Sequence, residues 1–441
     1  MIFSLDVLRA RKGDCLLLHF GTKAKPRLVM IDGGPSGVYR PFLRPRLVKI
    51  RKARGLSNQD SLPVEALMVS HVDDDHIKGV LDLATELLDD QGAQAPYLVD
   101  VSDLWHNTFD DLLETKEDGL SNVAAGYGIA AVGGAIDVAN DTEFDVAKVL
   151  AGIAQGRDLR IDAATLNWKI NKKFGEKLIV ATKQSKAVKL AGSVEMTVVG
   201  PLKPELDDLR KKHDKWLRDN ADKIADSSAG VPASYTDSSV HNLSSLVFLA
   251  EANGKRMLLT GDARGDKILE GLQLVGLMAK GKSSTLHVDV LKVPHHGSSN
   301  NLVKSFFRRV TADHYVFSGN GEHGNPERET MEMLFSARPN AAFTIHLTYP
   351  IDDIDKEREK DWKKAQEQEK RRRSKSKTAA AKKKVKVRPN WSAAKNGLAA
   401  FFKANPLKNN QEIRIVDPAS GHVIDLLDPI GDSWPSLSGP N

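Results

Sequence analysis

The densest group of chemically capable side chains in this chain is the run His71-Val72-Asp73-Asp74-Asp75-His76. It places two imidazoles and three carboxylates in one short stretch. Carboxylates that converge in a loop repel one another and lose hydration unless a cation neutralises them. An acidic loop can also be solvated, or can cap a following helix through Asp73 or Asp74. We favour a divalent metal site, with the solvated or capping loop as the alternative.

Three further candidate groups follow strand-like apolar runs downstream. They are Gly261-Asp262 after Met257 to Thr260, His295-His296 after Val290 to Pro294, and a glycine-rich loop with His323 after Val316 to Ser318. A single Asp or His at a strand end more often forms a turn or a local hydrogen bond. Four such strand ends in one chain indicate a shared site.

The elements that must position these groups alternate between strands and helices. Strands are predicted at Ile2 to Val7, Cys15 to Phe20, Arg27 to Ile31 (before Asp32-Gly33-Gly34), Pro63 to Ser70, Ser193 to Val199 and Leu286 to Val293. Two hairpins are predicted, one turning at Asn253-Gly254 and one formed by Glu412 to Val416 and His422 to Leu426. Gly79 to Leu88 has helical spacing, so the motif lies between a strand and a helix. This pattern predicts an α/β fold.

Composition excludes several protein classes. The chain has 441 residues, 41% hydrophobic and 28% charged, as in globular proteins. No run approaches the ~20 apolar residues of a membrane span, so we expect no membrane partner and a cytoplasmic protein. Cys15 is the single cysteine. Any metal must therefore be held by histidines and carboxylates.

The net charge of +6 is concentrated near the carboxyl end. Lys370 to Arg388 holds 11 lysines and arginines and no acid, so the rest of the chain sums to −5 (+6 minus 11). Such a run is either a solvated segment or an arm that binds a polyanion such as nucleic acid. Both interpretations stay open.

The motifs together resemble a known superfamily. Asp32-Gly33-Gly34, the His71 to His76 run, Thr260-Gly261-Asp262 and His295-His296-Gly297-Ser298 follow in the order seen in metallo-β-lactamase-fold hydrolases. The chain is most similar to the hydrolase domain of the competence protein ComEC and its relatives, from Met1 to about Thr348. The resemblance implies an αββα sandwich over residues 1–350. We expect a mostly helical insertion at about residues 91–189, forming a lid or cap. Residues 351–441 would add a charged helix, the basic segment and the C-terminal hairpin.

The chain departs from the superfamily pattern His-x-His-x-Asp-His, because Asp73 occupies the place of the second histidine. No counterpart of the next histidine ligand is evident either. The resemblance implies one metal position with His71, Asp73 and Asp262, and another with Asp75, His76, Asp262 and either His295 or His296, of which we favour His295. More carboxylate favours harder ions, so manganese joins zinc as a candidate, and one of the two sites can be weak or empty.

The implied reaction is hydrolysis by a metal-activated water. Asp75 would orient that water, His323 would stabilise charge on the substrate oxygens, and Asp32 would orient the ligands. We expect a phosphodiesterase or nuclease. The alternatives are hydrolysis of a small phosphoester or ester, or a catalytically weak binding or signalling subunit of a multi-gene defence system.

Overall fold

The structure is a computed structural model that describes residues 1–108, 141–191, 194–207, 211, 244–375, 385–408, 410–418 and 421–430, with the backbone alone for 141–151 and 153. Within these ranges, no helix has the length and apolar character needed to cross a bilayer.

One sheet has seven strands in the order β17-β1-β2-β3-β5-β7-β8. Its strands are β1 (Ile2–Val7), β2 (Leu16–Thr22), β3 (Lys25–Ile31), β5 (Ala66–Met68), β7 (Asp103–Trp105), β8 (Lys169–Ile170) and β17 (Val423–Asp425). β3, β5, β7 and β8 run parallel. Parallel strands end at one edge of a sheet, so Asp32, Ser70 and His106, which follow three of these strands, lie along the same edge.

The other sheet has eight strands in the order β16-β15-β14-β13-β12-β11-β10-β9. Its strands are β9 (Val188–Leu190), β10 (Val194–Gly200), β11 (Val247–Ala252), β12 (Lys255–Leu259), β13 (Leu286–Lys292), β14 (Val310–Phe317), β15 (Phe343–Leu347) and β16 (Gln411–Ile415). From β12 to β16 the pairing is parallel. This arrangement brings the residues after β12, β13 and β14 to a common edge. A separate pair is formed by β4 (Leu62–Val64) and β6 (Val99–Val101).

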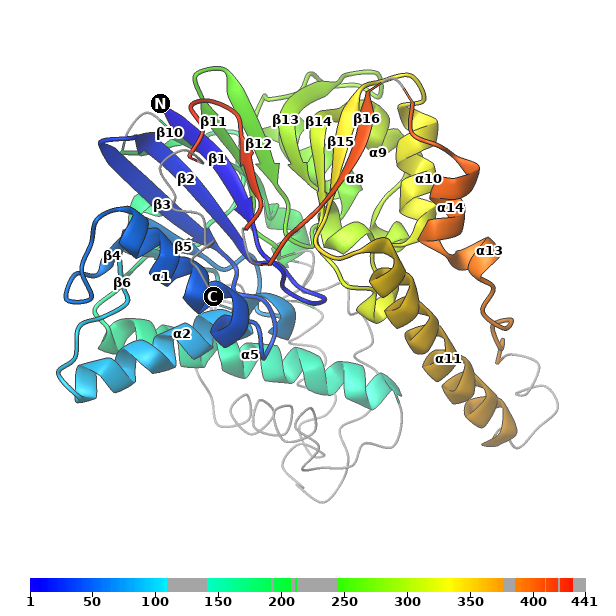
Figure 1. The fold of residues 1–441 in the computed structure, drawn as a ribbon, viewed down its shortest axis with the longest axis horizontal. Coiled ribbons are helices and arrows are strands. Elements are labelled where there is room, and N and C mark those ends of the chain that lie inside the picture. The colour runs from blue at the N-terminus through cyan, green and yellow to red at the C-terminus, as the bar shows by residue number, and fades with distance from the viewer. Residues whose placement is uncertain are drawn as a thin grey trace, which may run out of the picture.

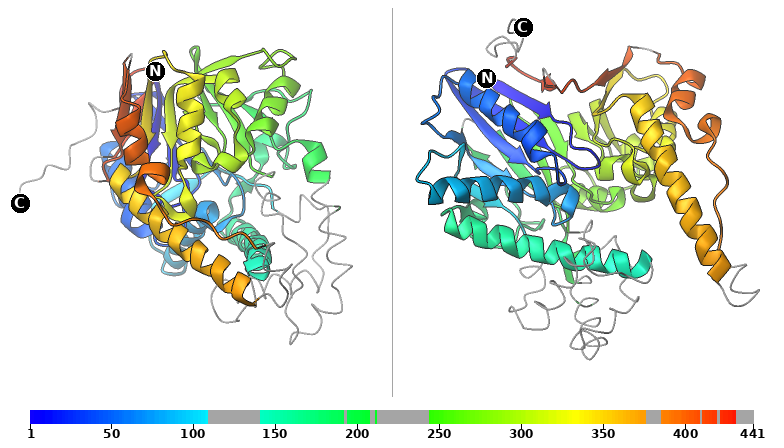
Figure 2. Two further views of the ribbon diagram at one scale, coloured as in Figure 1. Left: turned by 90° about the vertical axis from the view of Figure 1, so that its right-hand side faces the viewer. Right: turned by 60° about the horizontal axis from the view of Figure 1, so that its bottom comes forward.

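Helices cover the outer face of each sheet, as Figures 1 and 2 show. On the seven-stranded side lie α1 (Arg44–Ala53), α2 (Asp74–Gly92) and α5 (Asp141–Thr165). On the other side lie α8 (Gly265–Leu274), α9 (Lys304–Arg309), α10 (Arg328–Ala337), α11 (Ile351–Lys375), α13 (Ala393–Asn396) and α14 (Leu398–Ala404). Short helical turns are η1 (Tyr39–Leu43), η2 (Lys172–Phe174), η3 (Pro294–Gly297), η4 (Ser299–Asn301) and η5 (Glu322–Gly324). The distal part of α11 extends away from the body (Figure 1).

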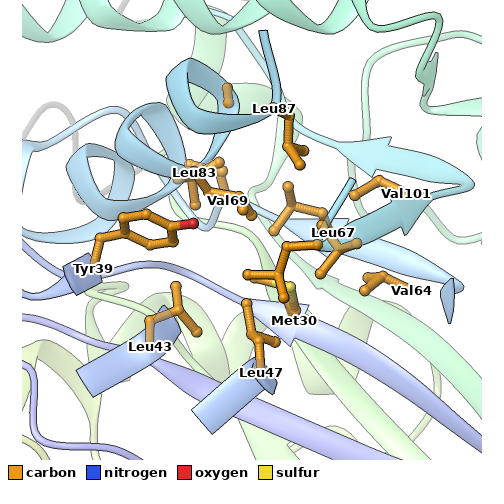
Figure 3. Packing of buried hydrophobic residues seen from close by; sticks show 14 of the residues in the cluster. Met30, Tyr39, Leu43, Leu47, Val64, Leu67, Val69, Leu83, Leu87 and Val101 are labelled. Atoms are coloured by element: carbon orange, nitrogen blue, oxygen red, sulfur yellow. The ribbon is translucent and has the colours of Figure 1, made fainter. Parts of the chain in front are cut away.

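Three hydrophobic clusters hold these layers together. The central cluster joins side chains from both sheets, such as Phe20 from β2 and Phe248 from β11. A second cluster packs α1, α2 and α5 on the seven-stranded sheet, where Leu47, Leu67 and Leu83 meet (Figure 3). A third packs α8 to α11 and α14 on the eight-stranded sheet. The order of layers is therefore helix, sheet, sheet, helix, and the α/β fold class predicted from sequence is confirmed.

Two sequence-based expectations need correction. The stretch 91–189 is more than a helical insertion, because its described part also contains strands of both sheets. It supplies β6, β7, β8 and β9, and α5 packs on the outer face beside α2. Residues 109–140 of this stretch lie outside the described residues. The strands in this stretch have only two or three residues, which is too short to show an alternating apolar pattern. The sequence therefore showed no sign of them.

The predicted C-terminal hairpin is also wrong. β16 pairs in parallel with β15, whereas β17 pairs antiparallel with β1 in the other sheet. Two short strands with a turn between them are typical of a hairpin. However, each sheet has an edge strand with unpaired backbone groups, and each C-terminal strand pairs with one of these edges. The chain crosses from one sheet to the other instead.

Candidate metal centre

The two sheets bring their strand ends together at one place, and glycines make the close packing there possible. The Asp32 to Gly34 loop lies against the first turns of α2, where the Gly33 N–H donates to the His76 carbonyl at 2.8 Å. A Cβ on Gly79 would stand 2.0 Å from the Gly33 carbonyl oxygen. A Cβ on Gly13 would stand 1.9 Å from the carbonyl oxygen of Asp75. Only glycine allows these backbones to approach one another.

The centre is built from four atoms of four buried side chains. They are the Nε2 atoms of His71, His76 and His296, and Oδ1 of Asp262, all buried and without a hydrogen-bond partner among the described residues. Asp262 Oδ1 lies 3.4 Å from His76 Nε2 and 3.3 Å from His296 Nε2. Its Oδ2 lies 3.9 Å from His71 Nε2. Ligand atoms about 2.0–2.1 Å from one tetrahedral ion stand roughly 3.3–3.4 Å apart. The spacing therefore suits a cation.

Carboxylates and hydroxyls on the far side of the rings set the direction of these imidazoles. His76 Nδ1 donates to Asp32 Oδ2 at 2.8 Å. Asp32 also accepts the backbone N–H and the hydroxyl of Ser70, both at 2.7 Å. A histidine that donates from Nδ1 to a carboxylate presents the lone pair of Nε2, which is the arrangement of many metal-bound histidines.

His296 is held in the same way by groups that the sequence did not single out. Its Nδ1 lies 3.3 Å from Asp14 Oδ1 and 3.2 Å from the Ser318 hydroxyl, which itself donates to Asp14. Asp14 also accepts from Lys292 Nζ at 2.8 Å, and both side chains are buried. Asp14 lies between the predicted strands Ile2 to Val7 and Cys15 to Phe20, and Lys292 lies inside a predicted strand, so neither was predicted as a site residue.

The electrostatic field of the centre favours positive charge. Burial opposes ionisation of His296, yet the Asp262 and Asp14 carboxylates outweigh it and raise the pKa of His296 to about 9. Burial would raise the pKa of Asp262, but His296, His295 and His76 hold it well below its usual range. A site that stabilises protonated imidazoles in this way also stabilises a metal cation in their place.

The remaining predicted site residues line the more open side. Asp75 Oδ2 lies 3.9 Å from His296 Nε2, and His295 Nε2 lies 3.5 Å from Asp262 Oδ2. Asp73 occupies the N-cap position of α2 but makes no side-chain capping hydrogen bond, and its Oδ2 lies 3.6 Å from His71 Nε2. His323 contacts Lys12, whose Nζ lies 3.3 Å from His323 Nε2. The capping interpretation of Asp73 is thus not the one the structure shows.

Residue groups with ligand spacing, within the described parts of the chain, include His71-His76-Asp262, Asp75-His76-His296 and Asp14-Asp262-His296. His296 belongs to these groups and is buried, whereas His295 belongs to none of them and its side chain is 26% exposed. From the sequence we favoured His295, but the orientation of these two adjacent histidines depends on the turn that follows β13.

The turns after β3, β13 and β14 have an unusual backbone conformation. His295, His296 and His323 adopt left-handed backbone conformations, with φ of 48°, 54° and 57°, and Asp32 does so with φ of 57°. A left-handed residue other than glycine costs of order 1–3 kcal/mol, and such residues cluster at functional sites. Four of them here support a functional role for this edge.

No protein-family profile matches the chain. It is similar to microtubule-associated protein 1A of human, 32% identical over 90 residues, which is 20% of this chain and 3% of that protein. The mouse protein is 33% identical over 88 residues, again 20% of this chain and 3% of that protein. The chain thus spans a very small part of these relatives.

One solved structure, a Parabacteroides distasonis protein provisionally assigned as a metal-dependent hydrolase, aligns with 78% of this chain and 98% of its own, at 8% identity and a TM-score of 0.28. A likeness this weak says nothing of the fold or the activity of the present chain.

Proposed function

We propose that this chain is a metal-dependent hydrolase of the metallo-β-lactamase superfamily and that it cleaves phosphodiesters. The observation that carries the proposal is the convergence of three buried imidazole nitrogens and one buried carboxylate oxygen without hydrogen-bond partners among the described residues. Buried polar atoms are normally paired, so a set of unpaired ones gathered around Asp262 calls for a ligand. A divalent cation there would act as a Lewis acid and would lower the pKa of a bound water.

The residues of the centre divide into those that hold the cation and those that face the substrate. We assign one cation position to His71, His76 and Asp262, with Asp73 beside His71, and a second position to Asp75, His76 and His296. His295 is then the less favoured ligand of the adjacent pair. Two imidazoles and one carboxylate in each group suit zinc, whereas the neighbouring aspartates keep manganese a candidate.

The substrate side carries both signs of charge. Asp75, beside His296 and at the start of α2, accepts a proton from the attacking water or holds it in place. His323 and Lys12 face each other and bind the anionic oxygens of the phosphate. The resemblance to the hydrolase domain of ComEC and its relatives makes a phosphodiesterase of the nuclease type the favoured reaction.

The test combines metal analysis with activity. Protein purified without chelator is analysed for bound metal, then assayed on bis-p-nitrophenyl phosphate, DNA, RNA, a cyclic nucleotide and a choline phosphate, with zinc and then with manganese. We expect bound transition metal and phosphodiesterase activity in the wild type, and loss of both in Asp262→Ala. Asp266→Ala, a surface carboxylate paired with Arg264, is the control and keeps both. A metal-free, inactive wild type would contradict the proposal and favour a binding or signalling subunit.

We further propose that the basic run beginning at Lys370 binds the nucleic-acid backbone. The supporting observation is that α11 is attached to the His323 loop: the His323 N–H donates to Asp361 at 2.6 Å, and Arg358 donates to the Gly324 carbonyl at 3.0 Å. At the far side of the run, Arg388 returns to α11 and donates to Glu369 at 2.9 Å. A nucleic-acid strand bound at the end of α11 would therefore be held at a fixed distance from the metal centre.

Charge reversal separates this role from the chemistry. Arg371→Glu/Arg372→Glu should lower the rate on DNA and RNA at low salt and leave the rate on bis-p-nitrophenyl phosphate unchanged, because phosphate contacts act through salt-dependent attraction. An unchanged rate on nucleic acid would contradict this role of α11.

A further inference from the structure

A second cluster of cationic side chains lies at the opposite end of the seven-stranded sheet from the metal centre. It lines a groove of about 630 Å³ that includes Lys25, Arg27, Lys172 and Lys173 together with Glu65 and Asp103. β3 begins at Lys25, and Asp32 follows its other end. At about 3.3 Å per residue, the groove is roughly 20 Å from the metal centre along the strand. We call it the lysine groove.

Both carboxylates of the groove are already engaged by the fold. Asp103 is buried and accepts the backbone N–H groups of Lys172 at 2.9 Å and Lys173 at 3.0 Å, and the Trp105 indole at 2.9 Å. These bonds hold η2 in place with both lysine side chains exposed. The buried acid thus orders the backbone of the groove and does not neutralise its lysines.

Glu65 is engaged in the same way. It accepts from Arg27 at 3.1 Å and from the Ala191 N–H at 2.7 Å. Lys173 Nζ reaches only a neutral group, the Lys189 carbonyl, at 3.2 Å. Lys25 and Lys172 form no ion pair with any of the residues that the structure describes. The groove therefore carries an excess of positive charge.

The chain around η2 extends this charge. Residues 169 to 189 contain seven lysines and a single acid, Glu176, and all seven lysines are exposed. This local excess exists although the chain outside the basic C-terminal run has a net negative charge. Of these lysines, Lys189 pairs with Glu195 at 3.5 Å, and the excess that remains near the groove favours an anionic ligand.

We propose that the lysine groove binds the phosphate groups of a nucleotide or of a nucleic-acid strand. Its volume lies within the roughly 300–1,000 Å³ of sites for small ligands. Lysines are compact charges that suit the several oxygens of a phosphate. Pro26 and Pro63 line the same groove and offer apolar surface to a sugar or base. This site is distinct from the metal centre and does not depend on hydrolysis.

Binding is measured by fluorescence anisotropy on the full chain with excess chelator, so that no substrate is cut. The probes are labelled ATP and a labelled single-stranded DNA of about 12 nucleotides, a length typical of single-strand sites. Wild type is compared with Lys25→Glu/Lys172→Glu, with the conservative Lys25→Arg/Lys172→Arg, and with the control Lys280→Glu/Lys282→Glu. The control lysines are equally exposed but precede β13 in the other half of the molecule.

We expect Lys25→Glu/Lys172→Glu to weaken binding of at least one probe about tenfold or more, while the arginine pair and the control stay near wild type. The slope of log K against log salt should become shallower by about 1.4 for the DNA, because each phosphate that a lysine neutralises contributes about 0.7 to the slope. If ATP and DNA compete for binding, they share one site. If the protein binds DNA but not ATP, the groove is a site for a nucleic-acid strand.

Absence of wild-type binding to both probes, or equal losses in the groove variant and the control, overturns the proposal. The single change Lys25→Gln, on an exposed strand end, provides a milder variant whose folding is checked by thermal unfolding. If the lysine groove binds neither probe, the metal centre can still hydrolyse its substrate. The proposal for the groove and the proposal for the metal centre are therefore tested independently.

Discussion

The buried pair of Lys292 and Asp14 is the least expected feature at the scale of single residues. Lys292 is 1% exposed and its ammonium group lies 2.8 Å from Asp14. Burial would raise the pKa of Asp14, but Lys292 and His296 hold it well below its usual range. A buried cation requires such a partner, and removing one partner of a buried pair typically costs about 3–5 kcal/mol.

This pair yields the first prediction. Asp14→Asn should lower the free energy of unfolding by about 3–5 kcal/mol, because it leaves Lys292 buried without a counter-charge. The double variant Asp14→Asn/Lys292→Met should recover a large part of that loss. Urea unfolding of the single and double variants measures this coupling. Additive losses would show that the two groups do not stabilise each other.

At the scale of elements, the position of α2 depends on its contact with the loop after β3. Gly79 lies in α2 with no room for a Cβ, whereas Gly92, at the end of the same helix, has nothing within 4 Å. The two glycines therefore form a matched pair.

Gly92→Ala should leave stability unchanged or raise it by up to about 1 kcal/mol, because alanine favours helix. Gly79→Ala should instead destabilise the protein and weaken metal binding, because the new methyl group forces α2 and His76 away from the Asp32 loop. Thermal unfolding and competition with a chromogenic chelator measure the two effects. Equal stabilisation by both changes would contradict the close contact.

A row of three histidines connects β14, β15 and the chain before β17. His314 Nδ1 lies 3.0 Å from His346 Nε2, and His346 Nδ1 lies 2.6 Å from His422 Nε2. Burial, followed by the neighbouring His422 and His314, lowers the pKa of His346 to about 2. His346 therefore stays neutral in the folded protein at pH values where the unfolded chain is protonated.

The sign of the pH effect follows from this. The stability associated with a histidine of lowered pKa is present above its unfolded pKa of about 6.5 and is lost as the pH falls. His346 alone should lower the free energy of unfolding by about 1.4 kcal/mol when the pH falls from 7.5 to 5.5. Urea unfolding at both values should show a smaller pH dependence in His346→Gln than in wild type. His287→Gln, at an exposed site on β13, should keep the wild-type dependence.

At the scale of the whole molecule, the C-terminal strands join the two sheets. β16 covers the edge of β15 and β17 covers the edge of β1, so both sheets are completed by the last described part of the chain. Ser4 on β1 donates to Asp425 at 2.6 Å. We therefore expect the C-terminal strands to unfold together with the rest of the fold.

Two isoleucines test this. Ile424 on β17 is 4% exposed and belongs to the central cluster, whereas Ile415 on β16 is 42% exposed. Ile424→Ala should lower the free energy of unfolding by about 2–5 kcal/mol, and Ile415→Ala by less than about 0.5 kcal/mol. A single unfolding transition by circular dichroism and by fluorescence should persist in both. A separate early transition in Ile424→Ala would indicate an independent C-terminal unit.

The sequence by itself determined most of the individual strands and the identity of the motif. β1, β3, β11, β12 and β13 lie where alternation and turns predicted them, because such signals are local. The positions of Asp262 and His295-His296 after their strands were visible for the same reason. A strand end followed by a polar residue can be recognised within a few residues of chain.

Only the tertiary structure decided which groups meet. Asp14 reaches Ser318 across 304 residues, and Lys292 and His296 meet Asp14 from the opposite sheet. The burial of His296 in preference to His295, the sheet that each C-terminal strand joins, and the lysine groove likewise depend on pairing between distant segments. Contacts of this kind arise from the packing of one sheet on the other, and no short stretch of sequence contains them.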